Sequence, residues 1–119
     1  MGKVLIVDDD LTLCELLKEM ITIFGYETIV AENKNLAVKN YKKEAENIDL
    51  AIIDMNLDDA TGDEVYKELM EINNKFTAIL ATGMTADLDK DEFFDLGFKE
   101  IINKPYSMDQ IQKLVKKYM

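Results

Sequence analysis

Val4-Leu5-Ile6-Val7-Asp8-Asp9-Asp10 places four consecutive apolar residues directly before three acidic ones. An apolar run without polar alternation is typical of a strand in a parallel sheet that is covered by helices on both faces. A more mixed segment, residues 26–31, predicts an edge strand. Three further apolar runs predict buried strands: Leu50-Ala51-Ile52-Ile53, Ala78-Ile79-Leu80-Ala81 and Ile101-Ile102.

Helical patterns lie between these strands. The clearest pattern spaces Leu13, Leu17, Met20 and Phe24 by four, three and four residues, and Gly25 is placed to end that helix. Alternating strands and helices predict an α/β fold with a doubly wound five-stranded parallel sheet, because right-handed crossovers place helices on both faces. The other predicted helices cover residues 34–46, 63–72, 86–96 and a final segment that starts with the capping-box residues Ser107 and Gln110.

The composition limits the possible functions. A chain of 119 residues is expected to form one domain. Its net charge of −10 disfavours direct binding to nucleic acid or to an anionic membrane surface. The absence of His excludes Ser-His-Asp triads and the commonest zinc sites. Because the sequence has no signal peptide and no apolar run of about 18 residues, we expect a cytoplasmic protein.

Polar residues stand where the predicted strands end, which is the edge where open α/β sheets bind ligands. Asp8 and Asp9 follow the first strand, and Asp54, Thr82 and Lys104 follow the third, fourth and fifth. Clustered carboxylates cannot all remain ionised in a partly dry site without a cation, and Mg²⁺ prefers such oxygen ligands. An amine and a hydroxyl suit phosphoryl oxygens, and a carboxylate can attack phosphorus.

The chain resembles the receiver domain of two-component response regulators. The resemblance covers residues 3–118, and it implies a single receiver domain over residues 1–119 with the flavodoxin-like strand order 2-1-3-4-5. Five separated features carry it, and they are Val7-Asp8-Asp9, Ile53-Asp54-Met55-Asn56, Gly62, Ala81-Thr82-Gly83 and Lys104-Pro105.

The resemblance also implies a role for each acidic residue of the site. Asp54 would accept a phosphoryl group from the phosphohistidine of a partner protein and would be one of the Mg²⁺ ligands. Asp9 would bind the Mg²⁺ ion directly and Asp8 would bind it through water. The main-chain carbonyl of Asn56 would complete the protein ligands.

Further implications concern the phosphoryl group and the output of the domain. Thr82 and Lys104 would hold the phosphoryl oxygens, and the Lys104-Pro105 peptide would be cis. Phosphorylation would change the affinity for a partner at the face formed by the fourth helix, the fifth strand and the last helix, including Ile101 and Tyr106.

The resemblance implies a signalling protein rather than an enzyme, with self-phosphorylation and self-dephosphorylation limited to Asp54. Because the chain has no His, a sensor histidine kinase or a His phosphotransfer protein must supply the phosphoryl group. A downstream protein target is expected, and the chain itself is expected to be a monomer or a weak phosphorylation-dependent dimer. It ends after the last helix, which fits a stand-alone regulator or a domain cut from a larger protein.

The sequence departs from the family pattern at three places. Residues 57–62 lack the Pro that usually follows the acceptor, which predicts a looser loop. Ile101 stands where the family often has Tyr or Phe, so coupling through an aromatic ring is not expected. Met84 lies two residues after Thr82, where an apolar side chain would shield the acyl phosphate from water.

Two other functions compete with a phosphoacceptor. The stretch Asp8-Asp9-Asp10-Leu11-Thr12 satisfies the Asp-x-Asp-x-Thr motif of haloacid-dehalogenase-type phosphatases, with Asp8 as nucleophile and Asp10 as general acid. Such an enzyme does not require Asp54 or Lys104-Pro105, and Asp10 is favoured as the N-cap of the following helix. A pseudo-receiver that binds its partner constitutively would usually lack the acceptor or the Lys, and both are present.

Overall fold

A computed structural model describes residues 2–83 and 88–119. One five-stranded sheet has the order β2-β1-β3-β4-β5, and every pair of neighbouring strands is parallel. The predicted fold class and strand order are therefore confirmed, with the mixed segment at the edge as β2. The strands are β1 (Lys3–Val7), β2 (Glu27–Ala31), β3 (Ile48–Asp54), β4 (Thr77–Thr82) and β5 (Glu100–Asn103).

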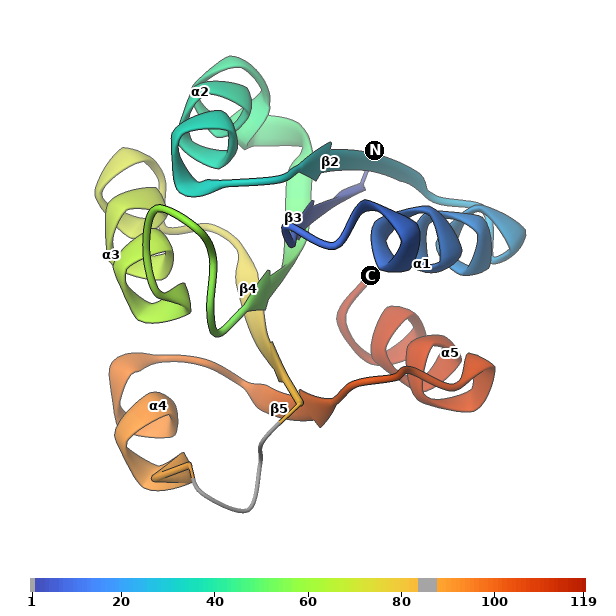
Figure 1. The fold of residues 1–119 in the computed structure, drawn as a ribbon. Coiled ribbons are helices and arrows are strands. Elements are labelled where there is room, and N and C mark those ends of the chain that lie inside the picture. Colours follow the sequence, from blue (N-terminus) through green and yellow to red (C-terminus); the bar gives the residue numbers. More distant parts are fainter. Residues whose placement is uncertain (1, 84–87) are drawn as a thin grey trace.

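Helices cover both faces of the sheet. In Figure 1, α1 and α5 lie on one side of the strands, and α2, α3 and α4 lie on the other. None of the helices in the described part of the chain has both the length and the apolar character that crossing a membrane requires. The helices are α1 (Leu11–Ile23), α2 (Lys34–Glu44), the short 3₁₀ helix η1 (Ala45–Asn47), α3 (Gly62–Ile72), α4 (Lys90–Leu96) and α5 (Met108–Tyr118).

The two-sided cover explains why the apolar runs do not alternate with polar residues. Successive side chains of a strand point to opposite faces. Val4 and Ile6 of β1 enter the core shared with α1 and α5, whereas Leu5 and Val7 enter the core shared with α2, α3 and α4. All four are at most 1% exposed, so each face of β1 is fully covered.

Several boundaries differ from those predicted by the sequence. Asp54 is the last residue of β3 and Thr82 the last residue of β4, rather than the first residues after them. The second helix stops at Glu44 and the chain continues as η1, because the hydrogen-bonding pattern tightens at this helix end. The helix predicted over residues 86–96 begins at Lys90, and Ala86 and Met84 lie outside the described residues.

The structure confirms the helix ends that the capping residues predicted. The Asp10 carboxylate accepts a hydrogen bond from the Leu13 amide at 3.1 Å and caps α1. Ser107 and Gln110 form the predicted capping box of α5. Gly25 follows the end of α1 with a φ of 93°, a conformation that side chains other than glycine disfavour.

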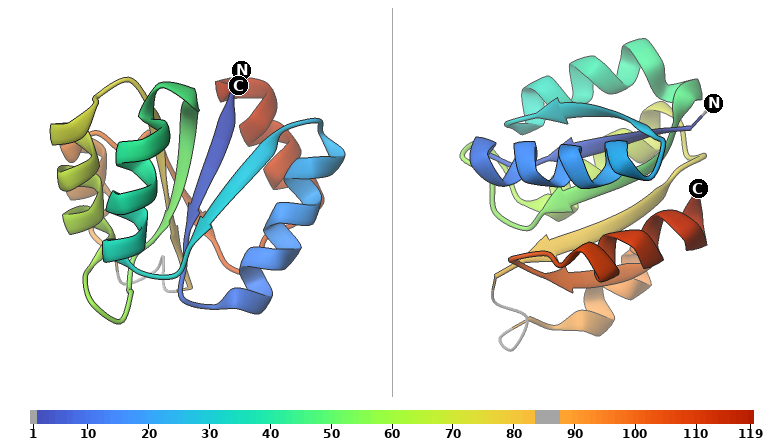
Figure 2. Two further views of the ribbon diagram at one scale, coloured as in Figure 1. Left: turned by 90° about the horizontal axis from the view of Figure 1, so that it is seen from above. Right: turned by 90° about the vertical axis from the view of Figure 1, so that its right-hand side faces the viewer.

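The carboxyl ends of all five strands lie at one end of the molecule, because the strands are parallel. Figure 2 (left) shows both chain termini at the opposite end, while the loops from β1 to α1 and from β3 to α3 lie together. The fold thus brings the polar residues of the strand ends into one region.

Gly62 lets α3 begin directly against the end of β3. A Cβ atom at this position would lie 2.7 Å from the Asp54 carbonyl oxygen and 3.2 Å from the Met55 Cα atom. The Gly62 amide also donates a hydrogen bond to the Met55 carbonyl at 2.8 Å. Because the obstructing atoms belong to the backbone, a side chain here would have to displace the strand end that carries Asp54.

The substitution Gly62→Ala is expected to lower the free energy of unfolding by about 1–3 kcal/mol, which is typical of overpacking a well-packed position. Urea denaturation measures this change. Gly83→Ala is the matched control, because a Cβ atom there meets none of the described residues within 4 Å and φ is not positive. Equal stability losses in the two variants would contradict the steric explanation.

Candidate functional site

Three carboxylates and one amine meet at the carboxyl end of the sheet. The Lys104 Nζ atom lies 2.6 Å from Asp8 Oδ2 and 3.0 Å from Asp54 Oδ1. One carboxylate oxygen from each of Asp8, Asp9 and Asp54 lies within 4.8 Å of the other two. The structure therefore brings together four of the residues that the sequence placed at separate strand ends.

The site is mostly shielded from water, which changes its electrostatics. Asp8 is 3% and Asp54 7% exposed, whereas Asp9 is exposed. Burial raises the pKa of Asp54 above its ordinary value, and the nearby Asp8 charge acts in the same direction against the opposing Lys104 hydrogen bond. Burial alone would lower the pKa of Lys104, but hydrogen bonds to both carboxylates outweigh this effect and raise it. The amine is therefore charged at neutral pH.

Asp8 is held by its neighbours in the fold. Its amide donates to the Ala31 carbonyl of β2 at 3.1 Å, and its Oδ1 atom accepts from the Asp10 amide at 3.0 Å. The Cys14 Sγ atom donates to the Asp8 carbonyl at 3.4 Å. Cys14 is buried as expected, and burial, with a smaller contribution from Asp8, raises the pKa of its thiol to about 12. Cys14 therefore remains a neutral thiol that supports Asp8.

Thr82 and Lys104 are neighbours across β4 and the end of β5. The Lys104 amide donates to the Thr82 carbonyl at 3.0 Å, and Thr82 is 3% exposed. The Lys104-Pro105 peptide is cis, as the resemblance implied. The two residues expected to hold phosphoryl oxygens thus come from adjacent chain segments at the same edge.

Asn56 lies in the loop between β3 and α3. It is exposed and pairs with Thr61 as an isolated antiparallel bridge. Within this turn the Leu57 amide donates to the Ala60 carbonyl at 2.9 Å. The position of Asn56 therefore depends on the loop, whereas the other site residues lie at or directly beside strand ends.

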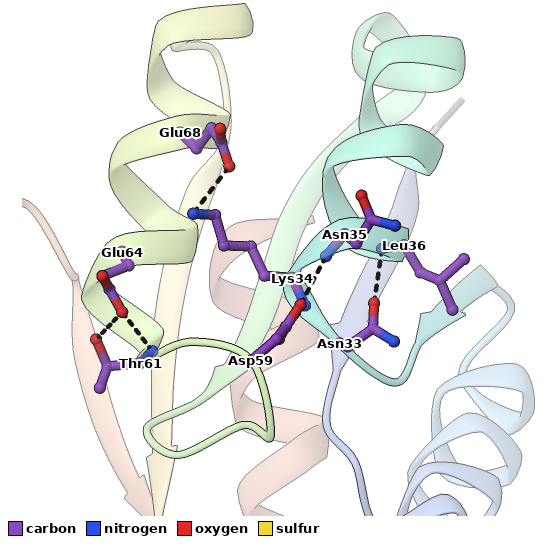
Figure 3. A network of polar contacts seen from close by, with 8 residues as sticks. All are labelled: Asn33, Lys34, Asn35, Leu36, Asp59, Thr61, Glu64 and Glu68. Carbon is purple, nitrogen blue, oxygen red and sulfur yellow. Dashed lines mark hydrogen bonds and ion pairs between the residues drawn. The ribbon is translucent and has the colours of Figure 1, made fainter.

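One carboxylate of this loop was not singled out by sequence reasoning. Asp59 accepts hydrogen bonds from the amides of Lys34 and Asn35 at the start of α2. Figure 3 shows this contact beside the Lys34–Glu68 ion pair, which joins α2 to α3. No local pattern could have indicated the contact, because the partners are 24 and 25 residues apart.

Asp10 agrees with the expectation that it caps a helix, whereas Tyr106 differs from its expected place. Asp10, the general acid required by the phosphatase alternative, caps α1 with its carboxylate. Tyr106, expected on the output face, is only 7% exposed because it packs in the core with α1 and α5. Burial raises the pKa of its hydroxyl well above the usual range, and Asp8 and Asp54 add to this effect.

The donor set fits a hard divalent cation. The carboxylates of Asp8, Asp9 and Asp54 offer oxygen ligands at one edge of the sheet, and one lysine does not neutralise three negative charges. Mg²⁺ is bound through a few carboxylates and keeps several waters or phosphate oxygens as further ligands. The partly exposed arrangement leaves one side open for them.

Known proteins resemble this chain along nearly its whole length. The family model of the response regulator receiver domain matches residues 4–116. Sporulation initiation phosphotransferase F from Bacillus subtilis is 34% identical over 118 residues, which are 98% of this chain and 93% of that protein. The transcriptional regulatory protein PhoP from the same species is 32% identical over 96% of this chain, which spans only 47% of PhoP.

A solved structure agrees in both fold and sequence. The response regulator TrrA from Thermotoga maritima, solved in complex with Mg²⁺-BeF, is 31% identical to this chain and superposes with a TM-score of 0.81. The alignment covers 100% of both chains. The chain belongs to the response regulator receiver domain family. It is therefore a signalling domain of two-component systems, and its acidic cluster fits a magnesium-binding phosphoacceptor site.

The raised pKa of Asp54 predicts how stability depends on pH. The folded state holds the Asp54 proton more tightly than the unfolded state, so the free energy of unfolding falls as pH rises from the ordinary value of 3.8 through the folded-state pKa. Asp54→Asn removes this loss and is expected to be more stable than the wild type at neutral pH in magnesium-free buffer.

Urea denaturation between acidic and neutral pH measures the difference between the two proteins. Asp58→Asn removes an exposed carboxylate and controls for net charge. A constant difference between wild type and Asp54→Asn across this pH range would contradict the burial argument.

Proposed function

We propose that this chain is a magnesium-dependent phosphoacceptor in which Asp54 takes a phosphoryl group from the phosphohistidine of a partner protein. The observation that carries the proposal is the Lys104 amine in contact with both Asp8 and Asp54, beside an Asp9 oxygen. In this proposal residues 1–119 form one receiver domain, which the family match over residues 4–116 supports.

The transfer forms one bond and breaks another. An Asp54 carboxylate oxygen bonds to phosphorus as the phosphorus–nitrogen bond of the phosphohistidine breaks, and the leaving imidazole keeps the electron pair. Phosphoryl transfer depends mainly on positioning and on charge stabilisation. The Lys104 ammonium and the Thr82 hydroxyl donate hydrogen bonds to the phosphoryl oxygens, and the charged Lys104 offsets their negative charge.

Four residues would hold the magnesium ion. Asp9 and Asp54 would bind it through carboxylate oxygens, Asn56 would bind it through its main-chain carbonyl, and Asp8 would bind it through water. When bound, Mg²⁺ would supply positive charge that offsets the negative charge of the phosphoryl group. The same site permits self-phosphorylation from a small phosphodonor, and attack of water on phosphorus restores Asp54.

Phosphorylation is proposed to act on the face formed by α4, β5 and α5. A phosphoryl group adds roughly −1.5 to −2 charges, and its hydrogen bond to Thr82 would act on the end of β4 beside β5. Ile101 of β5 supports this location because it lines a groove together with Lys113 and Lys116 of α5. Such a groove offers a downstream protein both apolar surface and positive charge.

The partners follow from the same chemistry. A sensor histidine kinase or a His phosphotransfer protein donates the phosphoryl group, since this chain contains no His. The domain works in the cytoplasm, without direct contact with nucleic acid or membrane, as a monomer or as a weak dimer formed on phosphorylation.

Incubation with acetyl phosphate and Mg²⁺ is expected to add the mass of one phosphoryl group to the wild-type protein and none to Asp54→Asn, because the variant lacks the attacking oxygen. Intact-protein mass spectrometry measures the adduct. Asp58→Asn, which alters an exposed carboxylate of the same loop, is the control and keeps the adduct. An adduct that persists in Asp54→Asn but disappears in Asp8→Asn would support the phosphatase alternative instead.

A further inference from the structure

The Asp59 carboxylate joins the loop after β3 to the start of α2. Its Oδ1 atom accepts a hydrogen bond from the Lys34 amide at 2.9 Å, and its Oδ2 atom accepts one from the Asn35 amide at 3.2 Å. Figure 3 shows the Asp59 side chain reaching the first turn of the helix beside Lys34 and Asn35. Both oxygens are thus used, which fixes the orientation of the side chain as well as its distance.

This contact completes the capping of α2. The first amides of an α-helix have no partner within the helix, and its positive end favours a negative charge. Asn33 accepts a hydrogen bond from the Leu36 amide at 2.8 Å, which leaves the two preceding amides to Asp59. The Lys34 and Asn35 amides hold the pKa of Asp59 below its ordinary value, so the carboxylate is charged at neutral pH.

The rest of the loop is closed by short-range hydrogen bonds. The Leu57 amide donates to the Ala60 carbonyl at 2.9 Å, and the Gly62 amide donates to the Met55 carbonyl at 2.8 Å. Glu64 accepts from the Thr61 amide at 2.9 Å. These bonds connect the residues of the loop to one another. The two hydrogen bonds between Asp59 and α2, which we call the loop tie, therefore also restrain the backbone at residue 56.

We propose that Asp59 is a positioning residue for the metal site, which holds the loop on α2 and thereby orients the main-chain carbonyl of Asn56. The inference rests on the proposed magnesium-binding function. In this proposal, the contact with α2 restrains the loop backbone next to Asp54. It takes the place of the proline ring that the family usually has in this loop. Without the loop tie, the Asn56 backbone would have more conformational freedom before the ion binds. Binding would then cost more conformational entropy, and the affinity for Mg²⁺ would be lower.

Isothermal titration with Mg²⁺ alone tests the inference. Asp59→Asn is expected to weaken binding about threefold to tenfold, at or below the roughly 10–100-fold effect of losing a direct outer-shell partner. Asp58→Asn removes the same charge one residue away and is expected to change the affinity less than about twofold. Within the described part of the chain, the Asp58 side chain makes no hydrogen bond or ion pair.

A second variant separates the loop tie from the stability of α2. Asn33→Ala removes the local cap of α2 but leaves both bonds to Asp59. It is expected to lower the thermal midpoint while the Mg²⁺ affinity remains that of the wild type. A merely structural role of Asp59 would instead give Asp59→Asn and Asn33→Ala the same affinity.

Hydrogen exchange gives a readout that does not depend on the affinity. Coupling between two sites is reciprocal, so Mg²⁺ is expected to slow amide exchange at Lys34 and Asn35 in the wild type but not in Asp59→Asn. Unchanged affinity in Asp59→Asn, or an equal loss in Asp58→Asn, would overturn the inference while leaving the phosphoacceptor proposal intact. Absence of Mg²⁺ binding by the wild type would overturn both.

Discussion

The Lys104 ammonium between Asp8 and Asp54 is the interaction on which the rest of the site depends. In the strand order, β3 and β4 separate β1 from β5, so the amine crosses over two strands to reach the carboxylate at the end of β1. Removal of Lys104 would leave both carboxylates without a compensating charge, and breaking a buried ion pair in this way typically costs about 3–5 kcal/mol. Lys104 thus allows two carboxylates to stay in a region shielded from water.

Lys104 compensates only part of the negative charge at the site. One amine faces three carboxylates, and the pKa of Asp54 remains raised despite the hydrogen bond from Lys104. The folded domain therefore carries an unfavourable interaction that a bound cation relieves. Since any ligand that binds only the folded state stabilises it, the repulsion among these carboxylates would favour the binding of a divalent ion.

Much of the fold and site could be predicted from the sequence because the signals are local. Unbroken apolar runs indicate strands covered on both faces, and parallel strands must deliver Asp8, Asp54 and Lys104 to the same edge. The burial of Tyr106 could not be predicted, because it lies between β5 and α5 where no periodicity assigns a face. The contact of Asp59 with α2 could not be predicted either, since the sequence does not show which distant amide a loop carboxylate will bind.

Helix N-termini distribute the negative charge at this edge. Each parallel strand is followed by a helix that begins at the same end of the sheet, so amides without helical partners gather there. These amides bind Asp10 at α1, Asp59 at α2 and Glu64 at α3. The carboxylates of Asp8 and Asp54 contact an amine instead, and an oxygen of Asp9 lies close to both of them. The edge therefore combines capped carboxylates, whose charge the helix amides stabilise, with one cluster of carboxylates that is suited to a cation.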